Sequence, residues 1–398
     1  MKRVIALLLV VAMLFLVSCR GKNNLNASSE TTSTDTSVAA ETSSAASTTS
    51  TTSDKSVTSN NVTTSHYSAI DNSNKSQPQS TTPIPETVNT TLKKGINLSS
   101  PFESADEVDY DSWVLNKDYY LKIKQKGFDH VRIPVNFPAH AIGAPDYTVD
   151  KEFLHQVDTA IDCALDTGLV AILDFHGWSN MNKDADGNKQ IFYKIWEQIA
   201  IRYQNYPANL FFELLNEPDG KADSGTSPLT NGKLNEIQNE AIRIIRQTNP
   251  TRTLVAAVNG ANGAWNIWDI SLPVDDKNII VSIHNYSSMK FTHQGANWLG
   301  FSSNRVTLTQ ATKDEITSNL KNSQNYMIKT GRTVWISEWG IYLGTANHDD
   351  VSEYMSFFRK QCEERGLPWC LWEFCVGFGA YDLTNDTWKD YITSNLFD

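Results

Sequence analysis

Two glutamates of this chain stand where buried strands are expected to end. Leu210–Gly220 reads LFFELLNEPDG, an apolar run that stops at Glu217 and Pro218. Pro218 cannot donate to a sheet ladder, so the strand must end there. Glu338 ends a second apolar run, TVWISE. A carboxylate at the tip of a buried strand loses solvation unless it is paired or its pKa moves. The two positions therefore predict acid–base and nucleophilic chemistry, whereas Glu213, inside its strand, is expected to be structural.

Other strand ends also carry groups suited to chemistry or to binding: Arg132, Asp174, His176, Asn216, His284, Tyr286 and Trp372. Each has a structural explanation when taken alone. Arg132 could pair with a structural carboxylate, and His176 or His284 could be a satisfied core histidine. Six strands that all end in ionisable or aromatic groups are difficult to attribute to packing. We therefore predict that these side chains converge on one site.

The elements that would position them alternate along the chain after Leu92. Eight strand-like segments are followed by helix-like spacing: Lys94–Leu98, His130–Val135, Val170–Phe175, Leu210–Glu217, Thr253–Val258, Ile279–Tyr286, Thr333–Trp339 and Pro368–Phe374. Six helices are expected at Lys117–Lys126, Glu152–Asp166, Gln190–Tyr203, Gly232–Gln247, Thr309–Lys329 and Val351–Arg365. Alternating units over about 300 residues predict an α/β fold, a (β/α)₈ TIM barrel. A doubly wound sheet is the alternative, but no GxGxxG loop follows the first strand.

In such a barrel the carboxyl ends of the strands share one mouth. Glu217 and Glu338, on strands four and seven, could then approach to about 5–5.5 Å, the separation expected of a retaining glycosidase. Like charges at that distance split their pKa values, so one carboxyl would act as acid and the other as nucleophile. Arg132 near the nucleophile would hold it ionised.

From about Leu92 to Asp398 the chain resembles glycoside hydrolase family 5, the cellulase family. Two motifs carry the resemblance, Asn216-Glu217-Pro218 and Glu338-Trp339-Gly340. The family's remaining active-site positions match Arg132, His176, His284, Tyr286 and Trp372. The resemblance implies that Glu217 is the acid/base and Glu338 the nucleophile, and that no metal or organic cofactor is needed.

The resemblance also implies the roles of the surrounding residues. Asn216 would hydrogen-bond the substrate 2-hydroxyl, and Tyr286 would orient Glu338. His284 would support Glu217, Trp372 would form the floor of the −1 subsite, and Arg132 and His176 would complete the polar shell. Trp178 and Trp298, with Trp265 and Trp268, are expected to be further sugar platforms. Three positions depart from the family pattern and are expected to touch the sugar-contacting shell: Phe175, Ser337 and Asp219.

Among family members the chain resembles broad-specificity bacterial endoglucanases. This implies a retaining endo-β-1,4-glucanase that cleaves internal β-1,4 linkages of plant polysaccharides through a covalent glycosyl-enzyme. A β-mannanase, xyloglucanase or mixed-linkage glucanase is the alternative. A non-catalytic glycan-binding lipoprotein is a remote one, because it predicts loss of a catalytic glutamate.

Composition restricts the partners. A net charge of −11 argues against nucleic acid as a partner, because that calls for a basic face. We expect a monomer that binds a β-linked polysaccharide. Four cysteines, Cys163, Cys362, Cys370 and Cys375, show no metal-site spacing and are expected to be buried thiols.

The amino-terminal segment has a different character. Residues 1–18 carry Lys2 and Arg3 before a short apolar run, which predicts a signal peptide. The run ends Leu16-Val17-Ser18-Cys19, which resembles the lipobox of bacterial lipoproteins and implies a lipid on Cys19 and contact with a membrane. Residues 19–91 are dominated by Ser and Thr, which predicts a disordered tether before the catalytic domain at 92–398. We expect an exported protein, anchored to the cell envelope or secreted.

Overall fold

The computed structural model describes residues 92–397, apart from 105–108, 110–111, 221–226 and 303. The predicted signal peptide (1–18), Cys19 and the predicted tether (19–91) lie outside these residues. Among the residues described, no helix combines the length and the apolar character needed to cross a membrane.

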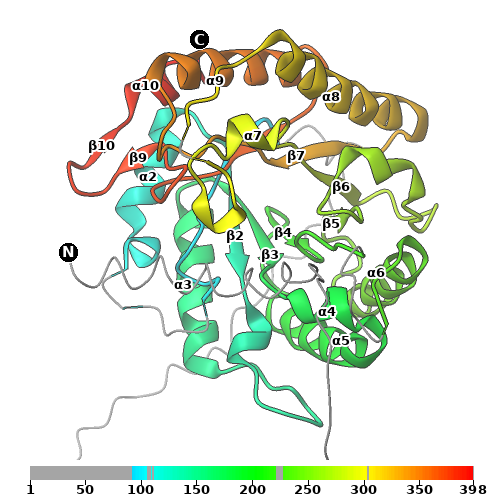
Figure 1. Ribbon diagram of the computed structural model, residues 1–398. Coiled ribbons are helices and arrows are strands. Elements are labelled where there is room, and N and C mark those ends of the chain that lie inside the picture. Colours follow the sequence, from blue (N-terminus) through cyan, green and yellow to red (C-terminus); the bar gives the residue numbers. More distant parts are fainter. Residues whose placement is uncertain (1–91, 105–108, 110–111, 221–226, 303, 398) are drawn as a thin grey trace, which may run out of the picture. The chain divides into compact units, whose positions relative to one another are not determined.

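Eight parallel strands close into a barrel, in which β1 pairs with both β2 and β8 (Figure 1). The strands are β1 (Lys94–Asn97), β2 (His130–Val135), β3 (Val170–Phe175), β4 (Leu210–Glu213), β5 (Leu254–Ala257), β6 (Ile279–His284), β7 (Val334–Glu338) and β8 (Trp369–Leu371). The predicted (β/α)₈ barrel is confirmed. Strand four is shorter than predicted, because the ladder stops at Glu213 and the chain reaches Glu217 as an irregular segment.

The helices surround the barrel. They are α2 (Lys117–Lys126), α3 (Lys151–Asp166), α4 (Ser179–Lys183), α5 (Ala185–Arg202), α6 (Asn231–Arg246), α7 (Met289–Thr292), α8 (Gln310–Thr330), α9 (His348–Glu363) and α10 (Asp390–Thr393). All six predicted helices are present. Within the residues that the structure describes, four 3₁₀ segments accompany them: η2 (Trp113–Leu115), η3 (Phe137–His140), η4 (Ala264–Asp269) and η5 (Asn297–Leu299). The connection from β5 to β6 contains η4 in place of an α-helix. Strands β9 (Tyr381–Asp382) and β10 (Thr387–Trp388) form a small separate sheet.

Local sequence explains where the helices begin. The side chains of Asp150, Asp184, Thr230 and Thr309 each accept a hydrogen bond from a backbone N–H in the first turn of α3, α5, α6 and α8. These caps satisfy donors that have no partner within the helix.

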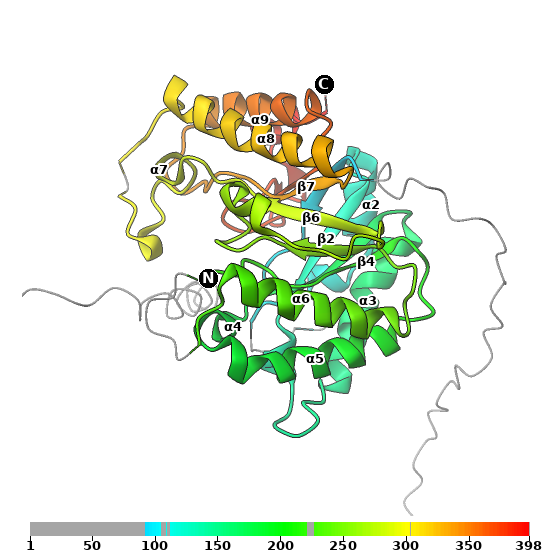
Figure 2. The same cartoon turned by 90° about the vertical axis from the view of Figure 1, so that its right-hand side faces the viewer.

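The α4 and α7 helices, which follow β3 and β6, lie at the same end of the barrel in Figure 2. That end is therefore where the carboxyl ends of the strands open.

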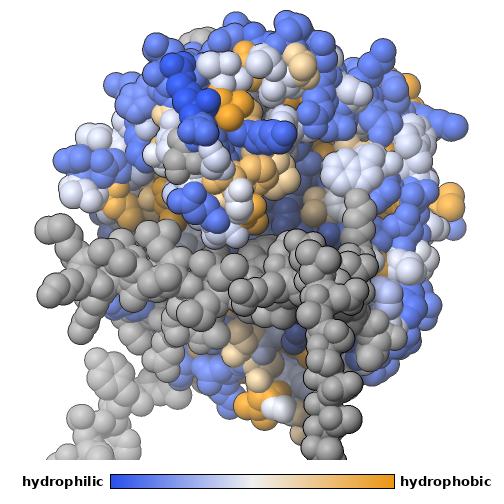
Figure 3. All heavy atoms as spheres, in the orientation of Figure 1, coloured by the Kyte–Doolittle hydropathy of each residue, from blue (hydrophilic) through white to orange (hydrophobic). Residues whose placement is uncertain are grey.

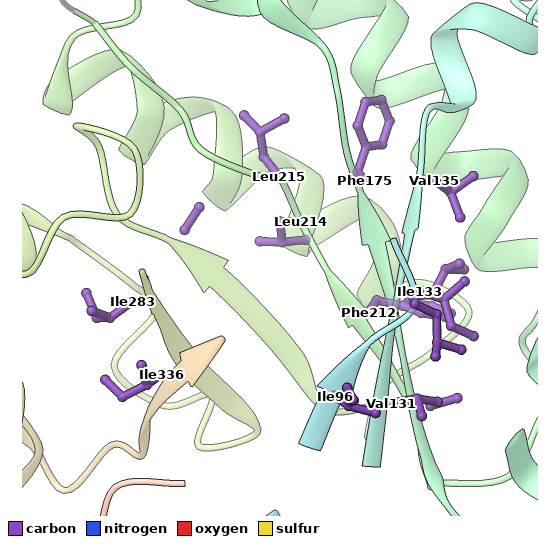
Figure 4. Packing of buried hydrophobic residues seen from close by; sticks show 14 of the residues in the cluster. Ile96, Val131, Ile133, Val135, Phe175, Phe212, Leu214, Leu215, Ile283 and Ile336 are labelled. Carbon is purple, nitrogen blue, oxygen red and sulfur yellow. The ribbon is translucent and has the colours of Figure 1, made fainter. Parts of the chain in front are cut away.

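Strand alternation divides the core into two layers. One cluster fills the barrel and includes Val170, Ile172, Val255, Ile280 and Trp335. A larger cluster packs the outer faces of the strands against the helices; Figure 4 shows part of it, with Val131, Ile133 and Val135 of β2. Because β2 alternates between these layers, Arg132 points into the barrel. It lies in the middle of β2, not at the end where it was predicted, and its side chain reaches up to the site.

Gly95 in β1 is a position where even a methyl group would clash. An added Cβ would lie 2.0 Å from Nε2 of His130. That ring is held by Asp129 Oδ1 at 2.6 Å and by the Trp335 indole N–H at 3.1 Å. We expect Gly95→Ala to lower the free energy of unfolding by about 1–3 kcal/mol, measured by urea denaturation. Gly143→Ala is the matched control, because nothing lies within 4 Å of its added Cβ. Equal stability of the two variants would contradict this account.

Candidate active site

The two predicted glutamates meet at the mouth of the barrel. One carboxylate oxygen of Glu217, one of Glu338 and a ring nitrogen of His284 all lie within 4.8 Å of one another. This is close to the separation of about 5–5.5 Å between the carboxyl groups of a retaining glycosidase. The local geometry therefore suits a double displacement on one anomeric carbon.

Glu217 stands on a turn with an unusual backbone. Its φ is 44°, in the left-handed region that costs a residue with a Cβ about 1–3 kcal/mol unless its surroundings fix it. Contacts to the backbone and to the side chain of this turn fix the conformation of Glu217. The carbonyl of Pro218 accepts a hydrogen bond from Ala261 N at 3.0 Å, and His284 Nδ1 lies 2.9 Å from Glu217 Oε1. The turn thereby aims a carboxyl group across the mouth.

Glu338 is held far more tightly. Its side chain is 5% exposed, Arg132 Nη1 donates to its Oε1 at 2.7 Å and the Tyr286 hydroxyl donates to its Oε2 at 3.0 Å. Burial raises the pKa of Tyr286 well above its ordinary value, with Glu338 adding to the shift, so the phenol keeps its proton and remains a donor. A carboxylate bonded by a guanidinium and a phenol is stabilised in its ionised form.

Arg132 is the centre of a buried charge network. Besides Glu338, its guanidinium contacts Glu213 Oε2 at 2.6 Å, Asp174 Oδ2 at 2.9 Å and Asn216 Oδ1 at 2.7 Å. Three carboxylates thus share one buried cation. Desolvation raises the pKa of Glu213, and it raises that of Asp174 to about 7, although Arg132 opposes both shifts. The network therefore retains protons near neutrality.

The two catalytic candidates differ electrostatically. Glu217 keeps 40% of its side chain exposed, yet its carboxyl lies deep among protein atoms, and this desolvation raises its pKa; His176 and Arg132 oppose the shift. Burial lowers the pKa of His284 to about 4, so its ring is neutral above that pH. Its Nε2 is buried and makes no hydrogen bond within the part of the chain that is described, which fits an unprotonated nitrogen.

His176, Asn216 and Trp372 complete the wall of the site. His176 Nδ1 lies 2.6 Å from Asp174 Oδ2, and its Nε2 lies 3.4 Å from the Asn216 amide nitrogen. The His176 and Trp372 rings are nearly parallel, with centroids 5.9 Å apart. The structure therefore brings together eight of the predicted site residues: Arg132, His176, Asn216, Glu217, His284, Tyr286, Glu338 and Trp372.

The predicted tryptophan platforms lie farther out. The rings of Trp298 and Tyr342 are in contact, with centroids 4.7 Å apart. Tyr342 also contacts Phe378, and Phe378 contacts Tyr286. Trp178 lies against Phe175 and Phe192 and is partly exposed. Both keep part of their rings toward solvent, and their role as platforms stays a prediction. Figure 3 shows that this face of the molecule is hollowed near its centre.

Two departures from the family pattern do not touch the sugar-contacting shell, contrary to expectation. Phe175 is fully buried on the outer face of β3 (Figure 4). Its ring packs against Phe137 and Trp196. Ser337 is also fully buried, and its hydroxyl lies 2.5 Å from that of Ser282. The reason is strand alternation, which turns Phe175 away from the mouth while its neighbour His176 faces it.

Three carboxyl groups near the site received no specific role from the sequence: Glu103, Asp174 and Glu373. Asp174 was among the side chains predicted to converge on the site, and it lies there beside His176, with which it shares one face of the strand. Glu103 Oε2 lies 3.8 Å from His176 Nε2. Glu373 is buried and accepts hydrogen bonds from the Ser99 hydroxyl and from Phe378 N at 3.3 Å. No pattern in the sequence signals these last two contacts.

Glu373 gives the fold a pH dependence. Burial raises its pKa from 4.5 to about 7. Between these values the folded protein binds more protons than the unfolded chain, so the free energy of unfolding falls as pH rises through this window. We expect Glu373→Gln to reduce that fall by on the order of 2 kcal/mol, measured by urea denaturation at pH 5 and pH 8. The exposed Glu353→Gln serves as control. An unchanged slope in Glu373→Gln would refute the assignment.

Two further predictions concern metals and thiols. Among the described residues, Glu217, His284 and Glu338 form the group that could hold a cation, but the Arg132 guanidinium already contacts Glu338 at 2.7 Å and would repel one. The four cysteines that the structure describes are free thiols, as predicted: Cys163, Cys362, Cys370 and Cys375. Cys375 is only partly buried.

Comparison with known proteins agrees with this geometry. The family model for cellulase, glycosyl hydrolase family 5, matches residues 86–377. Endoglucanase H of Acetivibrio thermocellus is 30% identical over 292 residues, which are 72% of this chain and 30% of that protein. Endoglucanase B of Clostridium cellulovorans is 28% identical over 321 residues, covering 75% of this chain and 71% of that protein. The chain thus spans less than a third of the length of endoglucanase H.

Solved structures show the same barrel. Cel5A of Thermotoga maritima in complex with cellobiose is 33% identical with a TM-score of 0.72, and the match covers 78% of this chain and 98% of that one. Its complex with mannotriose matches with 32% identity and a TM-score of 0.70, over 77% and 98% of the two chains. Since the family model spans well over half of the chain, this protein belongs to the cellulase family, glycosyl hydrolase family 5.

Proposed function

We propose that the protein is a retaining endo-β-1,4-glucanase that acts through a covalent glycosyl-enzyme. The observation that carries the proposal is the asymmetry of the two facing carboxyls. Arg132 and Tyr286 hold Glu338 as a carboxylate, whereas desolvation raises the pKa of Glu217. One group is therefore prepared to attack and the other to donate a proton.

In the first step Glu338 attacks the anomeric carbon while the bond from that carbon to the leaving oxygen breaks. Glu217 gives its proton to that oxygen. A neutral His284 with its proton on Nδ1 donates to Glu217 Oε1, which leaves Oε2 to carry the acidic proton. In the second step Glu217 takes a proton from water. The resulting hydroxide attacks the same carbon, and the ester bond to Glu338 breaks.

The other residues would bind the sugar whose bond is cleaved. Arg132 holds the Asn216 oxygen at 2.7 Å, which directs the amide nitrogen to the substrate 2-hydroxyl. Bonds to that hydroxyl strengthen in the transition state. The Trp372 face offers an apolar surface to the sugar ring, and His176 stands parallel to it.

A panel of polysaccharides tests the proposal. Carboxymethylcellulose, mixed-linkage glucan, glucomannan, mannan and xyloglucan would be supplied in turn, with product sizing and with NMR of the first anomer released. Internal cleavage of β-1,4-glucan with retention is the expected result. Faster cleavage of mannan or xyloglucan would favour the alternative activities; the Cel5A complex with mannotriose makes mannan a concrete one. Binding without cleavage would favour the glycan-binding lipoprotein.

We also propose that the protein is exported and anchored through a lipid on Cys19. The support is the apolar leader and the Leu16-Val17-Ser18-Cys19 sequence. Cells fed a labelled fatty acid should yield labelled protein in the envelope fraction, and Cys19→Ala should abolish the label. An unlabelled wild-type protein would refute the anchor and leave the simple secreted form.

We propose that the catalytic domain acts as a monomer, because all eight residues of the site come from one chain. Light scattering after size-exclusion chromatography tests this. A dimer mass at the concentrations used for assays would overturn it.

A further inference from the structure

Ser337 is an extra residue in strand β7. Strand β6 pairs Ile283 with Ile336 and its next residue, His284, with Glu338, so that Ser337 lies between the two pairs. An extra residue of this kind is a β-bulge, which bends a strand and re-aims the side chains beside it. The residue that follows this bulge is the proposed nucleophile, Glu338.

The bulge decides which way Glu338 points. Trp335 belongs to the cluster inside the barrel, whereas Ile336 belongs to the cluster between the strands and the helices. Plain alternation from these two residues would turn Ser337 inward and Glu338 outward, against the helices. In the structure Glu338 instead reaches the Arg132 guanidinium inside the barrel. The extra residue is therefore what turns the carboxylate into the mouth.

The Ser337 hydroxyl ties this bulge to strand β6. It lies 2.5 Å from the hydroxyl of Ser282, and both side chains are fully buried. The carbonyl of Ile283 is a second, more distant acceptor for it, at 3.3 Å. Ser282 in turn donates to Glu213 Oε1 at 3.0 Å and accepts from the Asn262 amide at 2.8 Å. The Ser337 side chain thus joins β7 to β6 at the position that the ladder passes over.

The same hydrogen bonds lead back to the Glu338 carboxylate. Glu213 Oε2 accepts from Arg132 Nε at 2.6 Å, and Arg132 Nη1 donates to Glu338 Oε1 at 2.7 Å. Arg132 Nη1 also donates to Asn97 Oδ1 at 3.1 Å, while the Asn97 amide donates to the carbonyl of Ser337 at 2.9 Å. Two closed rings of contacts therefore run from the carboxylate through Arg132 to the residue that precedes it in the chain.

We infer that Ser337 and Ser282 are positioning residues for the attack by Glu338. Their paired hydroxyls hold the bulge that aims Glu338, and through Glu213 they hold the guanidinium that binds its carboxylate. Both side chains are fully buried, so they act through these neighbours and do not bind sugar. The inference rests on the proposed function, in which Glu338 is the nucleophile. The departure of position 337 from the family pattern then affects the rate of attack and leaves substrate binding unchanged.

Inactivation by dinitrophenyl 2-fluoro-cellobioside isolates this attack. Because its leaving group departs without a proton, the rate constant of inactivation reports the attack by Glu338, and the inhibition constant reports binding. Ser337→Ala should lower the rate constant about tenfold, the effect of losing one buried hydrogen bond, and leave the inhibition constant unchanged. Ser282→Ala should lower it at least as much, because it also removes a donor to Glu213. The double variant should be no slower than Ser282→Ala, because both changes break the same contact.

Two further variants separate positioning from a general loss of packing. Ser323→Ala is the matched control, because Ser323 is also fully buried but donates to the Asn319 carbonyl of its own helix, α8, at 3.1 Å. It should leave both constants unchanged. Ser282→Thr keeps a hydroxyl in a strand that accommodates β-branched residues, and it should retain most of the wild-type rate constant.

Three results would overturn the inference. Wild-type rate constants in both alanine variants would show that the hydroxyl pair does not position Glu338. A weaker inhibition constant with an unchanged rate constant would place the serines in sugar binding. An equal loss of rate in Ser323→Ala would make the effect one of any buried serine. The two alanine variants break the contact from different strands, so either one that folds is sufficient for the test. If the fluoroglycoside does not inactivate the wild-type protein, the proposed function itself fails, and no variant is needed to see it.

Discussion

Replacing Glu338 by alanine is expected to lower kcat on β-glucan by about 10⁵-fold or more, the scale on which loss of a covalent nucleophile acts in other hydrolases. No other carboxylate can substitute. Glu213 and Asp174 lie within the same network, but both are fully buried and already paired with Arg132. The variant should still fold, since it removes one of three carboxylates that share a single cation.

A slow 2-fluoro glycoside tests the same assignment directly. It should accumulate as an ester on Glu338, found by mass spectrometry of peptides from the inactivated enzyme. Glu353→Ala, at an exposed glutamate on α9 that pairs with Lys313, should be inactivated and labelled as the wild type is. A label on Glu217 would reverse the proposed roles. A label on any other carboxyl would show that Glu338 is not the nucleophile.

The barrel and its eight central side chains could be predicted from the sequence because each strand end combines two signals. A buried apolar run fixes the strand, and a polar residue at its tip has no packing reason to be there. Glu217 and Glu338 both show this. These side chains are then expected to meet, because the carboxyl ends of all strands in a closed barrel lie at one mouth.

The sequence did not predict how individual side chains are oriented. Their orientation depends on how the strands pair and on how far each side chain extends. Phe175 and His176 are neighbours in sequence, yet Phe175 packs under a helix and His176 faces the mouth of the barrel. Arg132 lies mid-strand and reaches the site only because its side chain is long. Strand β7 contains one extra residue, Ser337, so Ile283 pairs with Ile336 whereas His284 pairs with Glu338. The reach of Arg132 and this register shift do not follow from residue type or spacing.

Replacing Glu217 by alanine is the second large effect, and its size should depend on the leaving group. For β-glucan, whose leaving sugar alkoxide needs a proton, we expect a loss of about 10²–10⁴-fold. For a dinitrophenyl cellobioside, whose leaving group departs without a proton, formation of the glycosyl-enzyme should be nearly unchanged. Azide added to this variant should then release a β-glycosyl azide, because a small anion can fill the place of the lost carboxylate.

The pH profile provides an independent test of the same residue. Because Glu217 must be protonated to act as acid, kcat/KM should fall as pH rises through its pKa. Desolvation raises that pKa, so the basic limb should lie above the ordinary value for a glutamate. In Glu217→Ala, assayed on the dinitrophenyl substrate, the basic limb should vanish. A basic limb that persists in this variant would place the proton donor on another group.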